Sequence, residues 1–259
     1  MSFRAGFVSF VGRPNVGKST LMNAIVGEKV AITSSKPQTT RHAIRGIVHR
    51  DAGQLIIVDT PGVHRPRTLL GQRLNDVVSA TLNDVDVIAL CIPATDKVGP
   101  GDRFIAQSLE NYPRAKKIAL VTKTDAASKS EIAQRLMEVN ELGQWETIIP
   151  VSGLLGDQLE ILVEEILALM PESEPLYSLD DSTEQSLEVR IQELIREATL
   201  EGVSDELPHS IAVTIDEMGE REDGLMQIFA NLWVERDSQK GIMIGKGGQK
   251  LKGIGQLAR

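Results

Sequence analysis

The chain has 259 residues, a net charge of −8 and a single cysteine, Cys91. One cysteine excludes a disulfide framework and favours a reducing cytoplasm. No apolar run approaches the roughly 20 residues that span a bilayer, which excludes an integral membrane protein and leaves peripheral membrane association open. The charge is uneven, because residues 171–206 carry eleven acidic residues against two arginines, whereas residues 236–259 carry six basic residues against one aspartate. This length allows one large and one small domain.

The segment GRPNVGKSTL at residues 12–21 matches the phosphate-binding pattern GxxxxGK[ST]. It lies between an apolar run at residues 5–11, which predicts a strand, and residues 20–26, whose apolar spacing predicts a helix. In such a loop backbone N–H groups surround the phosphates, the lysine reaches the β and γ oxygens, and the next hydroxyl ligates Mg²⁺. We therefore expect a nucleoside phosphate to bind at Gly12, Asn15, Val16, Gly17, Lys18, Ser19 and Thr20.

Strand-like and helix-like segments alternate up to residue 170. The strand-like runs are residues 43–50, 54–58, 85–92, 117–121 and 147–151, and the helix-like stretches lie near 102–111, 129–142 and 157–170. This alternation predicts an α/β domain with a mostly parallel sheet flanked by helices and with its ligand at the carboxyl ends of the strands. Residues 172–183 mix proline, serine and acidic side chains without apolar periodicity, so we expect a linker there.

The motif DTPG at residues 59–62 follows the strand-like run that ends at Val58. Asp59 is positioned to hold Mg²⁺ through water, and the Gly62 N–H is positioned to meet the γ-phosphate. Earlier in the chain, Thr40 of the segment QTTR at residues 38–41 would complete the Mg²⁺ coordination when the γ-phosphate is present. The expected metal ligands are Ser19, Thr40 and Asp59, and the expected catalytic residues are Lys18, Thr40 and Gly62. We expect the order of residues 29–42 and 61–73 to depend on GTP.

The motif TKTD at residues 122–125 follows another strand-like run and points to guanine. Asp125 can accept hydrogen bonds from both N1–H and the exocyclic amine of guanine, a pair that adenine does not offer. The segment VSG at residues 151–153 can present the N–H groups of Ser152 and Gly153 to guanine O6. Nucleotide-binding residues are therefore also expected at Asp59, Gly62, Thr122, Lys123, Asp125, Ser152 and Gly153.

In this order the five motifs resemble those of translation-factor-class P-loop GTPases, and GRPNVGKST with QTTR resembles the Era family. The resemblance implies hydrolysis of GTP and water to GDP and phosphate, with Mg²⁺. Thr122 stands where the family has asparagine, and we expect a threonine not to reproduce the reach of that amide. Val63 stands where Ras-like enzymes have a water-orienting glutamine, so hydrolysis must rely on backbone positioning, a partner or a monovalent cation. Resemblance to related bacterial GTPases implies Asn15 as a ligand of K⁺.

The remainder of the chain contains a second set of predicted elements. Residues 184–201 predict a helix, residues 208–216 and 226–236 predict two strands, and GKGG at residues 245–248 opens a further helix. This order with GxxG resembles a type II KH domain, in which the GxxG loop clamps a short run of single-stranded nucleotide backbone. The expected RNA-binding residues are Gly245, Lys246, Gly247, Gly248 and Lys250. Because residue 259 falls within the helix after GxxG, we expect the last helix and strand of the KH fold to be missing and RNA binding to be weak.

The predicted organisation is a GTPase domain over residues 1–171, a linker over 172–183 and a KH-like domain over 184–259. The resemblance implies contact with ribosomal RNA and a role in assembly of the small ribosomal subunit, in the cytoplasm and with a monomer as the default. The alternative is an RNA-binding scaffold in which guanine nucleotide is structural and hydrolysis is negligible. A small-molecule kinase or ATPase is disfavoured by TKTD.

Overall fold

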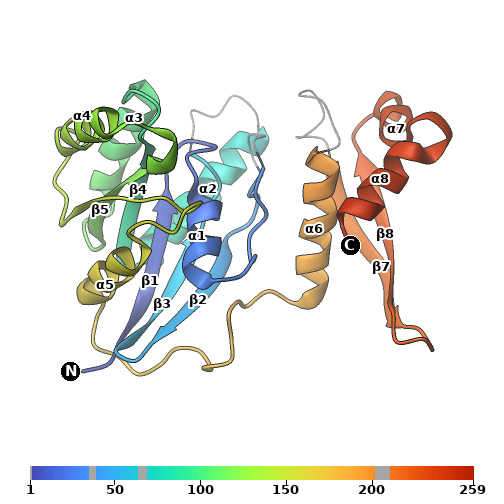
Figure 1. Ribbon diagram of the computed structural model, residues 1–259, viewed down its shortest axis with the longest axis horizontal. Helices are drawn as coiled ribbons and strands as arrows, with labels where there is room; N and C mark the ends of the chain where they lie inside the picture. The colour runs from blue at the N-terminus through green and yellow to red at the C-terminus, as the bar shows by residue number, and fades with distance from the viewer. Residues whose placement is uncertain (1, 35–38, 64–68, 202–210) are drawn as a thin grey trace. The chain divides into compact units, whose positions relative to one another are not determined.

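The computed structural model describes residues 2–34, 39–63, 69–201 and 211–259 (Figure 1). Contacts divide the chain into two units, Met1–Ala31 with Thr40–Glu184 and Ile32–Thr39 with Gln185–Arg259. In the described part of the chain no helix is both long and apolar enough to cross a bilayer.

The first unit is built on a six-stranded sheet with strand order β2-β3-β1-β4-β5-β6. All neighbouring strands pair in parallel except β2, which is antiparallel to β3. The strands are β1 (Arg4–Val11), β2 (Ile44–Arg50), β3 (Gly53–Asp59), β4 (Val87–Pro93), β5 (Lys116–Thr122) and β6 (Ile148–Pro150). This arrangement confirms the predicted α/β domain with a mostly parallel sheet.

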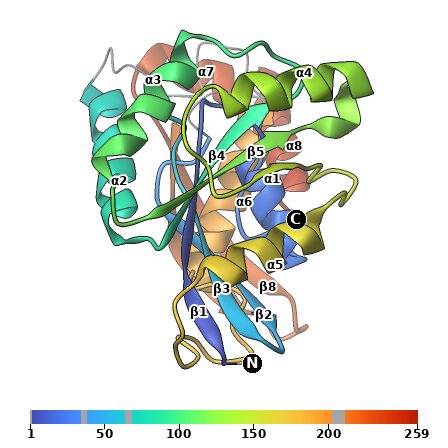
Figure 2. The ribbon, with the colours of Figure 1, turned by 90° about the vertical axis from the view of Figure 1, so that its left-hand side faces the viewer.

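Helices cover both faces of this sheet (Figure 2). They are α1 (Lys18–Val26), α2 (Leu69–Asp84), α3 (Pro100–Ser108), α4 (Lys129–Asn140) and α5 (Leu159–Leu169). Successive side chains of a strand point to opposite faces. Along β4, Val87 and Cys91 therefore pack with α1 and α5, whereas Ile88 and Leu90 pack with α2, α3 and α4. Burial on both faces explains why the central strands read as continuous apolar runs.

Helix α2 was not predicted, because residues 61–73 were interpreted only as a nucleotide-responsive segment. Its buried side chains Leu74, Val78 and Leu82 recur every four residues, a helical spacing that the sequence does contain. Residues 64–68 of that predicted segment, and Gln38 of QTTR, lie outside the described residues. The predicted helix at 102–111 is divided into α3 and a short 3₁₀ helix, η1 (Leu109–Asn111), and a second 3₁₀ helix, η2 (Thr124–Ala126), follows β5.

Residues 172–184, which include the predicted linker, lie along the first unit and bond to its sheet. The side-chain oxygen Oε1 of buried Gln54 accepts hydrogen bonds from the N–H groups of Leu176 at 2.7 Å and Tyr177 at 2.9 Å. The Ile47 N–H of edge strand β2 donates to the Ser182 carbonyl at 2.8 Å. Such pairing covers polar backbone groups that an edge strand otherwise leaves open.

The second unit is an α+β arrangement around a small apolar core. Its elements are α6 (Leu187–Glu201), the antiparallel pair β7 (Ile211–Glu220) and β8 (Met226–Val234), α7 (Asp237–Ile244), the 3₁₀ turn η4 (Lys246–Gly248) and α8 (Gln249–Leu257). The core contains Ala198, Ile211, Met243 and Ile254. The predicted helix–strand–strand–helix order is present, with α7 as an additional helix. Residues 208–210, the predicted start of the first strand, lie outside the described part.

Candidate functional site

The phosphate-binding loop leaves β1 between its neighbours β3 and β4, at the carboxyl ends of three parallel strands. Only glycine fits at position 12, because a Cβ there would lie 2.6 Å from the Cys91 carbonyl oxygen. Asn15 and Gly17 have φ values of 63° and 99°, in the left-handed region that glycine and asparagine adopt at low cost. The chain then enters α1 at Lys18. The local sequence therefore suits a tight loop ahead of a helix N-terminus.

Lys18, Ser19, Thr40 and Asp59, which are separated in the chain, meet at one point. The Ser19 hydroxyl donates to Asp59 Oδ2 at 2.6 Å, and the Thr40 hydroxyl donates to the same oxygen at 3.1 Å. The two hydroxyl oxygens lie 3.3 Å apart. Asp59 Oδ1 is buried and has no hydrogen-bond partner among the residues that the structure describes. A buried carboxylate oxygen without a partner marks a place for a cation or an ordered water.

Lys18 and Asp59 are both buried charges of opposite sign. Burial lowers the pKa of Lys18, and the charge of Asp59 opposes that change. Burial raises the pKa of Asp59, and Lys18 opposes that change. The Lys18 ammonium donates to the carbonyl oxygens of Gly12 at 3.4 Å and Arg13 at 3.2 Å. Phosphate oxygens would supply Lys18 with the negative charge that these neutral carbonyls do not.

The donor set fits magnesium, which prefers oxygen ligands and keeps several waters. Ser19 and Thr40 supply hydroxyl oxygens and Asp59 supplies the unpartnered carboxylate oxygen. No group of three His, Cys, Asp or Glu side chains able to hold a metal occurs within the described residues. A magnesium ion here would therefore take its remaining ligands from phosphate and water, as expected for a nucleotide-dependent site.

The DTPG loop lies directly against the phosphate-binding loop. The Val63 N–H donates to the Gly12 carbonyl at 3.0 Å. A Cβ on Gly62 would lie 2.7 Å from the Pro14 nitrogen, so this close approach requires glycine. The Val63 side chain is partly buried and packs against the apolar cluster that includes Val11 and Val58. Val63 therefore stabilises the loop by packing and offers no polar group to water.

A cavity of about 250 Å³ lies beside the phosphate-binding loop, and the guanine motif contributes to its wall. It is lined by Gly17, Thr20, Leu21, Thr122, Lys123, Asp125, Gly153 and Leu154. Six of these eight were expected from the sequence. Leu21 and Leu154 were missed, because an apolar residue next to a motif carries no signal of ligand contact. The cavity provides an apolar surface and one carboxylate, which suit the face and edge of a purine base.

Ser152 has a different role from the one expected. Its N–H donates to the Asp157 carbonyl at 3.2 Å, within the turn that leads to α5, instead of facing a base. Its hydroxyl donates to Asp125 Oδ1 at 2.5 Å and so orients the carboxylate of the guanine motif. Gly153 remains as the N–H donor expected for O6, and its backbone approaches α1 closely, since a Cβ would lie 3.0 Å from Leu21 Cα.

The Thr122 side chain bonds directly to the phosphate-binding loop. Its hydroxyl donates to the Val16 carbonyl at 2.6 Å, across a buried contact between the guanine motif and the phosphate-binding loop. The next residue, Lys123, has a φ of 57°, an uncommon left-handed conformation for a lysine. The two motifs are therefore joined by a direct hydrogen bond.

In the second unit, the GKGG segment forms the connection between α7 and α8. Gly245, Gly247 and Gly248 have φ values of 70°, 60° and 76°, which side chains disfavour. At Gly245 a Cβ would also lie 2.8 Å from Lys250 Cβ. Lys246 is exposed and Lys250 is half-buried. The loop thus presents bare backbone, two lysines and the N-terminus of α8, a combination that attracts phosphate groups.

Comparison with known families gives a match for each unit. Residues 7–124 match the family described as 50S ribosome-binding GTPase. Residues 206–259 match the family described as KH domain.

Curated relatives extend the similarity over nearly the whole chain. A GTPase Era of Nocardioides sp. (strain ATCC BAA-499 / JS614) is 57% identical over 266 aligned residues, covering 99% of this chain and 85% of the relative. A GTPase Era of Mycolicibacterium smegmatis is 57% identical over 261 residues, covering 99% of this chain and 87% of the relative.

Two solved structures resemble this one closely. One is a single-residue variant of Aquifex aeolicus Era bound to GDP.AlF4−, and the other is Era in complex with MgGDPNP and nucleotides 1506–1542 of 16S ribosomal RNA. Each has a TM-score of 0.94 and 35% sequence identity, and each alignment covers 99% of this chain and 87% of the other.

Proposed function

The chain belongs to the Era family of GTPases, and on that premise we propose that it couples GTP hydrolysis to binding of single-stranded ribosomal RNA during assembly of the small ribosomal subunit. The observation that carries the nucleotide half is the buried Asp59 carboxylate beside Lys18: its Oδ2 accepts from the Ser19 and Thr40 hydroxyls, and its Oδ1 has no partner among the described residues. The RNA half rests on the GKGG loop and on the related Era structure that contains 16S ribosomal RNA.

Lys18 and the phosphate-binding loop would hold the β- and γ-phosphates, with Gly62 N–H as a further donor to the γ-phosphate. Mg²⁺, held by Ser19, Thr40 and Asp59, supplies positive charge to the phosphate oxygens when bound. A water oxygen attacks the γ-phosphorus in line, the bond to the bridging oxygen breaks with its electron pair left on GDP, and the water proton passes to an oxygen of the released phosphate. Since Val63 offers no polar group, the backbone must position that water, assisted by K⁺ at Asn15 or by a partner.

Guanine selectivity would come from Asp125, which Ser152 orients, with Thr122, Lys123 and Gly153 forming the surrounding wall. The carboxylate accepts from N1–H and from the exocyclic amine, and a charged acceptor contributes about 2 kcal/mol. Adenine lacks this donor pair, so we expect GTP and GDP to bind in preference to ATP.

RNA would bind at Gly245, Lys246, Gly247, Gly248 and Lys250. The positive-φ glycines leave the backbone open to close approach, and the lysines neutralise phosphate charge. The surrounding segment at residues 236–259 has an excess of basic residues, in contrast with the acidic segment before it. Local charge rather than the net charge of −8 governs this contact.

We also propose a GTPase domain over residues 1–171, a linker over 172–183 and a KH-like domain over 184–259, in a cytoplasmic monomer. The division of contacts after Glu184 supports the start of the second domain. Hydrogen bonds join residues 172–184 to the sheet of the first unit, so the proposed linker is attached to the GTPase domain along its length.

Single-turnover GTP hydrolysis, in K⁺ or Na⁺ with Mg²⁺, tests the proposal. Wild type and Lys18→Ala are compared with and without a short single-stranded 16S ribosomal RNA oligomer. We expect a rate that depends on Lys18, that is higher in K⁺ and that rises with RNA. Equal rates in K⁺ and Na⁺ would remove the Asn15 assignment alone. A Lys18-dependent rate that is the same with and without RNA would contradict coupling of hydrolysis to RNA binding. Tight GTP binding without turnover would favour the scaffold alternative.

A further inference from the structure

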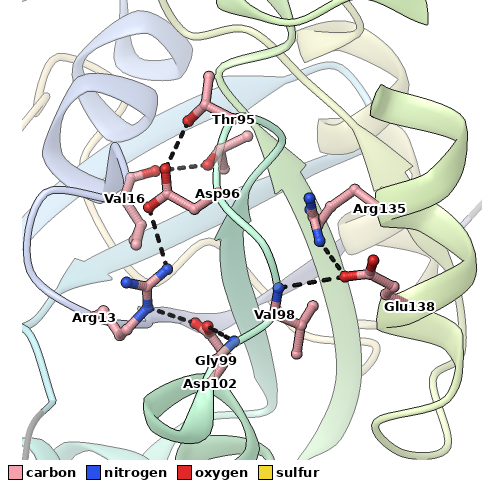
Figure 3. A network of polar contacts seen from close by, with 10 residues as sticks. Arg13, Val16, Thr95, Asp96, Val98, Gly99, Asp102, Arg135 and Glu138 are labelled. Carbon is pink, nitrogen blue, oxygen red and sulfur yellow. Dashed lines mark hydrogen bonds and ion pairs between the residues drawn. The ribbon is translucent and has the colours of Figure 1, made fainter. Parts of the chain in front are cut away.

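Arg13 belongs to the phosphate-binding loop, but its side chain points to the start of α3 (Figure 3). Its Nε donates to Asp102 Oδ1 at 2.8 Å, and its Nη2 lies 3.3 Å from Asp96 Oδ2. Burial alone lowers the pKa of Arg13, whereas the hydrogen bonds and charges of Asp102 and Asp96 raise it above its ordinary value. The guanidinium is therefore permanently charged and is held by two carboxylates.

Asp102 is the fixed end of this contact. Its side chain is only 1% exposed, and its second oxygen accepts the Gly99 N–H at 2.9 Å at the N-terminus of α3. Gly101 leaves room for the arginine stem, since a Cβ there would lie 3.0 Å from Arg13 Cδ. A buried carboxylate that loses its partner is strongly unfavourable, so Arg13 and Asp102 hold each other in place.

The β4–α3 loop is anchored on its other side as well. The Val98 N–H donates to Glu138 Oε2 of α4 at 3.3 Å, and the same oxygen pairs with Arg135 (Figure 3). Arg135 is itself buried. The carboxylate of Asp102 therefore belongs to a packed frame made by α3 and α4, against which the phosphate-binding loop is held.

The backbone of Arg13 reaches the reacting end of the site. Its carbonyl oxygen accepts from the Lys18 ammonium at 3.2 Å. The next residue, Pro14, contacts Gly62 of the DTPG loop, and Asn15 follows in the left-handed conformation. The guanine-binding residues contact the other end of the loop, at Val16 and Gly17.

We propose that Arg13 is a positioning residue for GTP hydrolysis: its ion pair with Asp102 holds the first half of the phosphate-binding loop so that Lys18 and Asn15 stand correctly about the γ-phosphate. This inference rests on the proposed roles of Lys18 and Asn15. Because the guanine end of the loop has its own attachment through Thr122, loss of the ion pair lowers the rate of hydrolysis more than the affinity for GDP.

The test compares wild type with Arg13→Gln, Asp102→Asn and the double variant. Arg50→Gln is the control, since Arg50 also pairs with a carboxylate, the more exposed Glu160 at 2.9 Å, and lies at the opposite end of β2 from the nucleotide loops. Single-turnover rates, GDP dissociation constants and melting temperatures are measured for each. A displacement well under 1 Å at the reacting groups suffices for a loss of about tenfold in rate.

We expect both single variants to lose about tenfold in rate, the double variant to lose no more than either, and GDP affinity to change less than about threefold. Arg50→Gln keeps the wild-type rate. Loss confined to Arg13→Gln, with weaker GDP binding, would show that Arg13 binds phosphate directly and would overturn the inference. Unchanged rates with lower melting temperatures would show that the ion pair stabilises the fold without affecting hydrolysis, and would overturn the inference.

Two further outcomes separate the underlying assumptions. Absence of Lys18-dependent turnover in wild type would contradict the proposed nucleotide site itself, not the role of Arg13. If Arg13→Gln does not fold, Arg13→Lys keeps one charged contact to Asp102, and we expect a rate between those of wild type and Asp102→Asn. A wild-type rate for both Arg13→Lys and Asp102→Asn would overturn the inference.

Discussion

The hydroxyl of Thr122 donates a 2.6 Å hydrogen bond to the carbonyl oxygen of Val16, 106 positions earlier in the chain. This bond joins the guanine motif to the phosphate-binding loop inside a buried contact. A hydroxyl provides one donor and an asparagine amide provides two, so threonine can make this connection with a single hydrogen bond. The guanine motif and the phosphate-binding loop are therefore directly connected in this chain.

Thr122→Val keeps the shape of the side chain and removes the hydroxyl. The Val16 carbonyl then stays buried without its donor, at a cost of about 1–3 kcal/mol. We expect GDP to dissociate about tenfold faster, measured by displacement of a fluorescent GDP analogue. Thr81→Val is the control, because its hydroxyl bonds within α2 to Val77 at 3.0 Å, and it should leave GDP dissociation unchanged. Unchanged dissociation for Thr122→Val would mean that the joint does not support binding.

Asp125→Asn should change the base preference of the site from guanine to xanthine. The asparagine amide donates to the xanthine O2 and repels the exocyclic amine of guanine, so GDP affinity should fall by about a hundredfold, or about 2–3 kcal/mol. Competition between GDP and xanthosine diphosphate measures the exchange. Ser152→Ala removes the 2.5 Å bond that orients Asp125 and the acceptor of the Leu155 N–H, and it should weaken GDP binding severalfold and create no xanthine binding. Retained GDP preference in Asp125→Asn would place the guanine elsewhere.

Gly62→Ala tests the close approach of the DTPG loop to the phosphate-binding loop. The new Cβ would lie 2.7 Å from backbone at Pro14, so one of the two loops must move. We expect GTP hydrolysis to fall by more than about tenfold while GDP binding is retained, because GDP lacks the γ-phosphate to which we propose that the Gly62 N–H donates. Gly143→Ala is the control, since a Cβ there would lie 3.4 Å from the Trp145 ring, an ordinary van der Waals contact. Equal rates for the two variants would contradict this role.

Lys246→Gln and Lys250→Gln test the RNA contact by salt dependence. Each phosphate contact that is lost should lower the slope of log affinity against log salt by about 0.7 for a single strand. Filter binding of a single-stranded 16S ribosomal RNA oligomer at several KCl concentrations gives that slope. Lys129→Gln, at an exposed position that begins α4, is the control. Slopes equal to the wild-type value for both test variants would remove these lysines from the interface.

Cys91 should be inert to alkylation in the folded protein. Burial raises the pKa of its thiol to about 12, so about one thiol in ten thousand is ionised at pH 8, and the side chain is fully buried. We expect iodoacetamide to modify Cys91 at least about a hundredfold faster in denaturant than in buffer, followed by mass spectrometry. Similar rates in both conditions would show that β4 opens readily.

Local motifs were predictable because the residue types within most of these motifs favour the backbone conformation of the loop. GRPNVGKST, DTPG and GKGG each place glycine or asparagine where a tight loop needs one, whereas TKTD has Lys123 in the left-handed conformation. The alternation of apolar strands with helical periodicity predicted a mostly parallel sheet with its ligand at the carboxyl ends of the strands, and the mostly parallel sheet is observed. Helix α2 was missed even though its four-residue spacing is present, because its first turn overlaps a segment interpreted as responsive to nucleotide.

By itself, the sequence determined the chemistry: the lysine, the hydroxyls, the carboxylates and the glycines of a guanine nucleotide site, and a basic glycine loop suited to RNA. Only the tertiary structure decided which partners these groups have. Thr122 bonds Val16, Ser152 turns its hydroxyl to Asp125, and Arg13 pairs with Asp102, 89 positions away. The reason is physical, because these contacts depend on the strand order β2-β3-β1-β4-β5-β6, which brings together loops that chain order keeps apart.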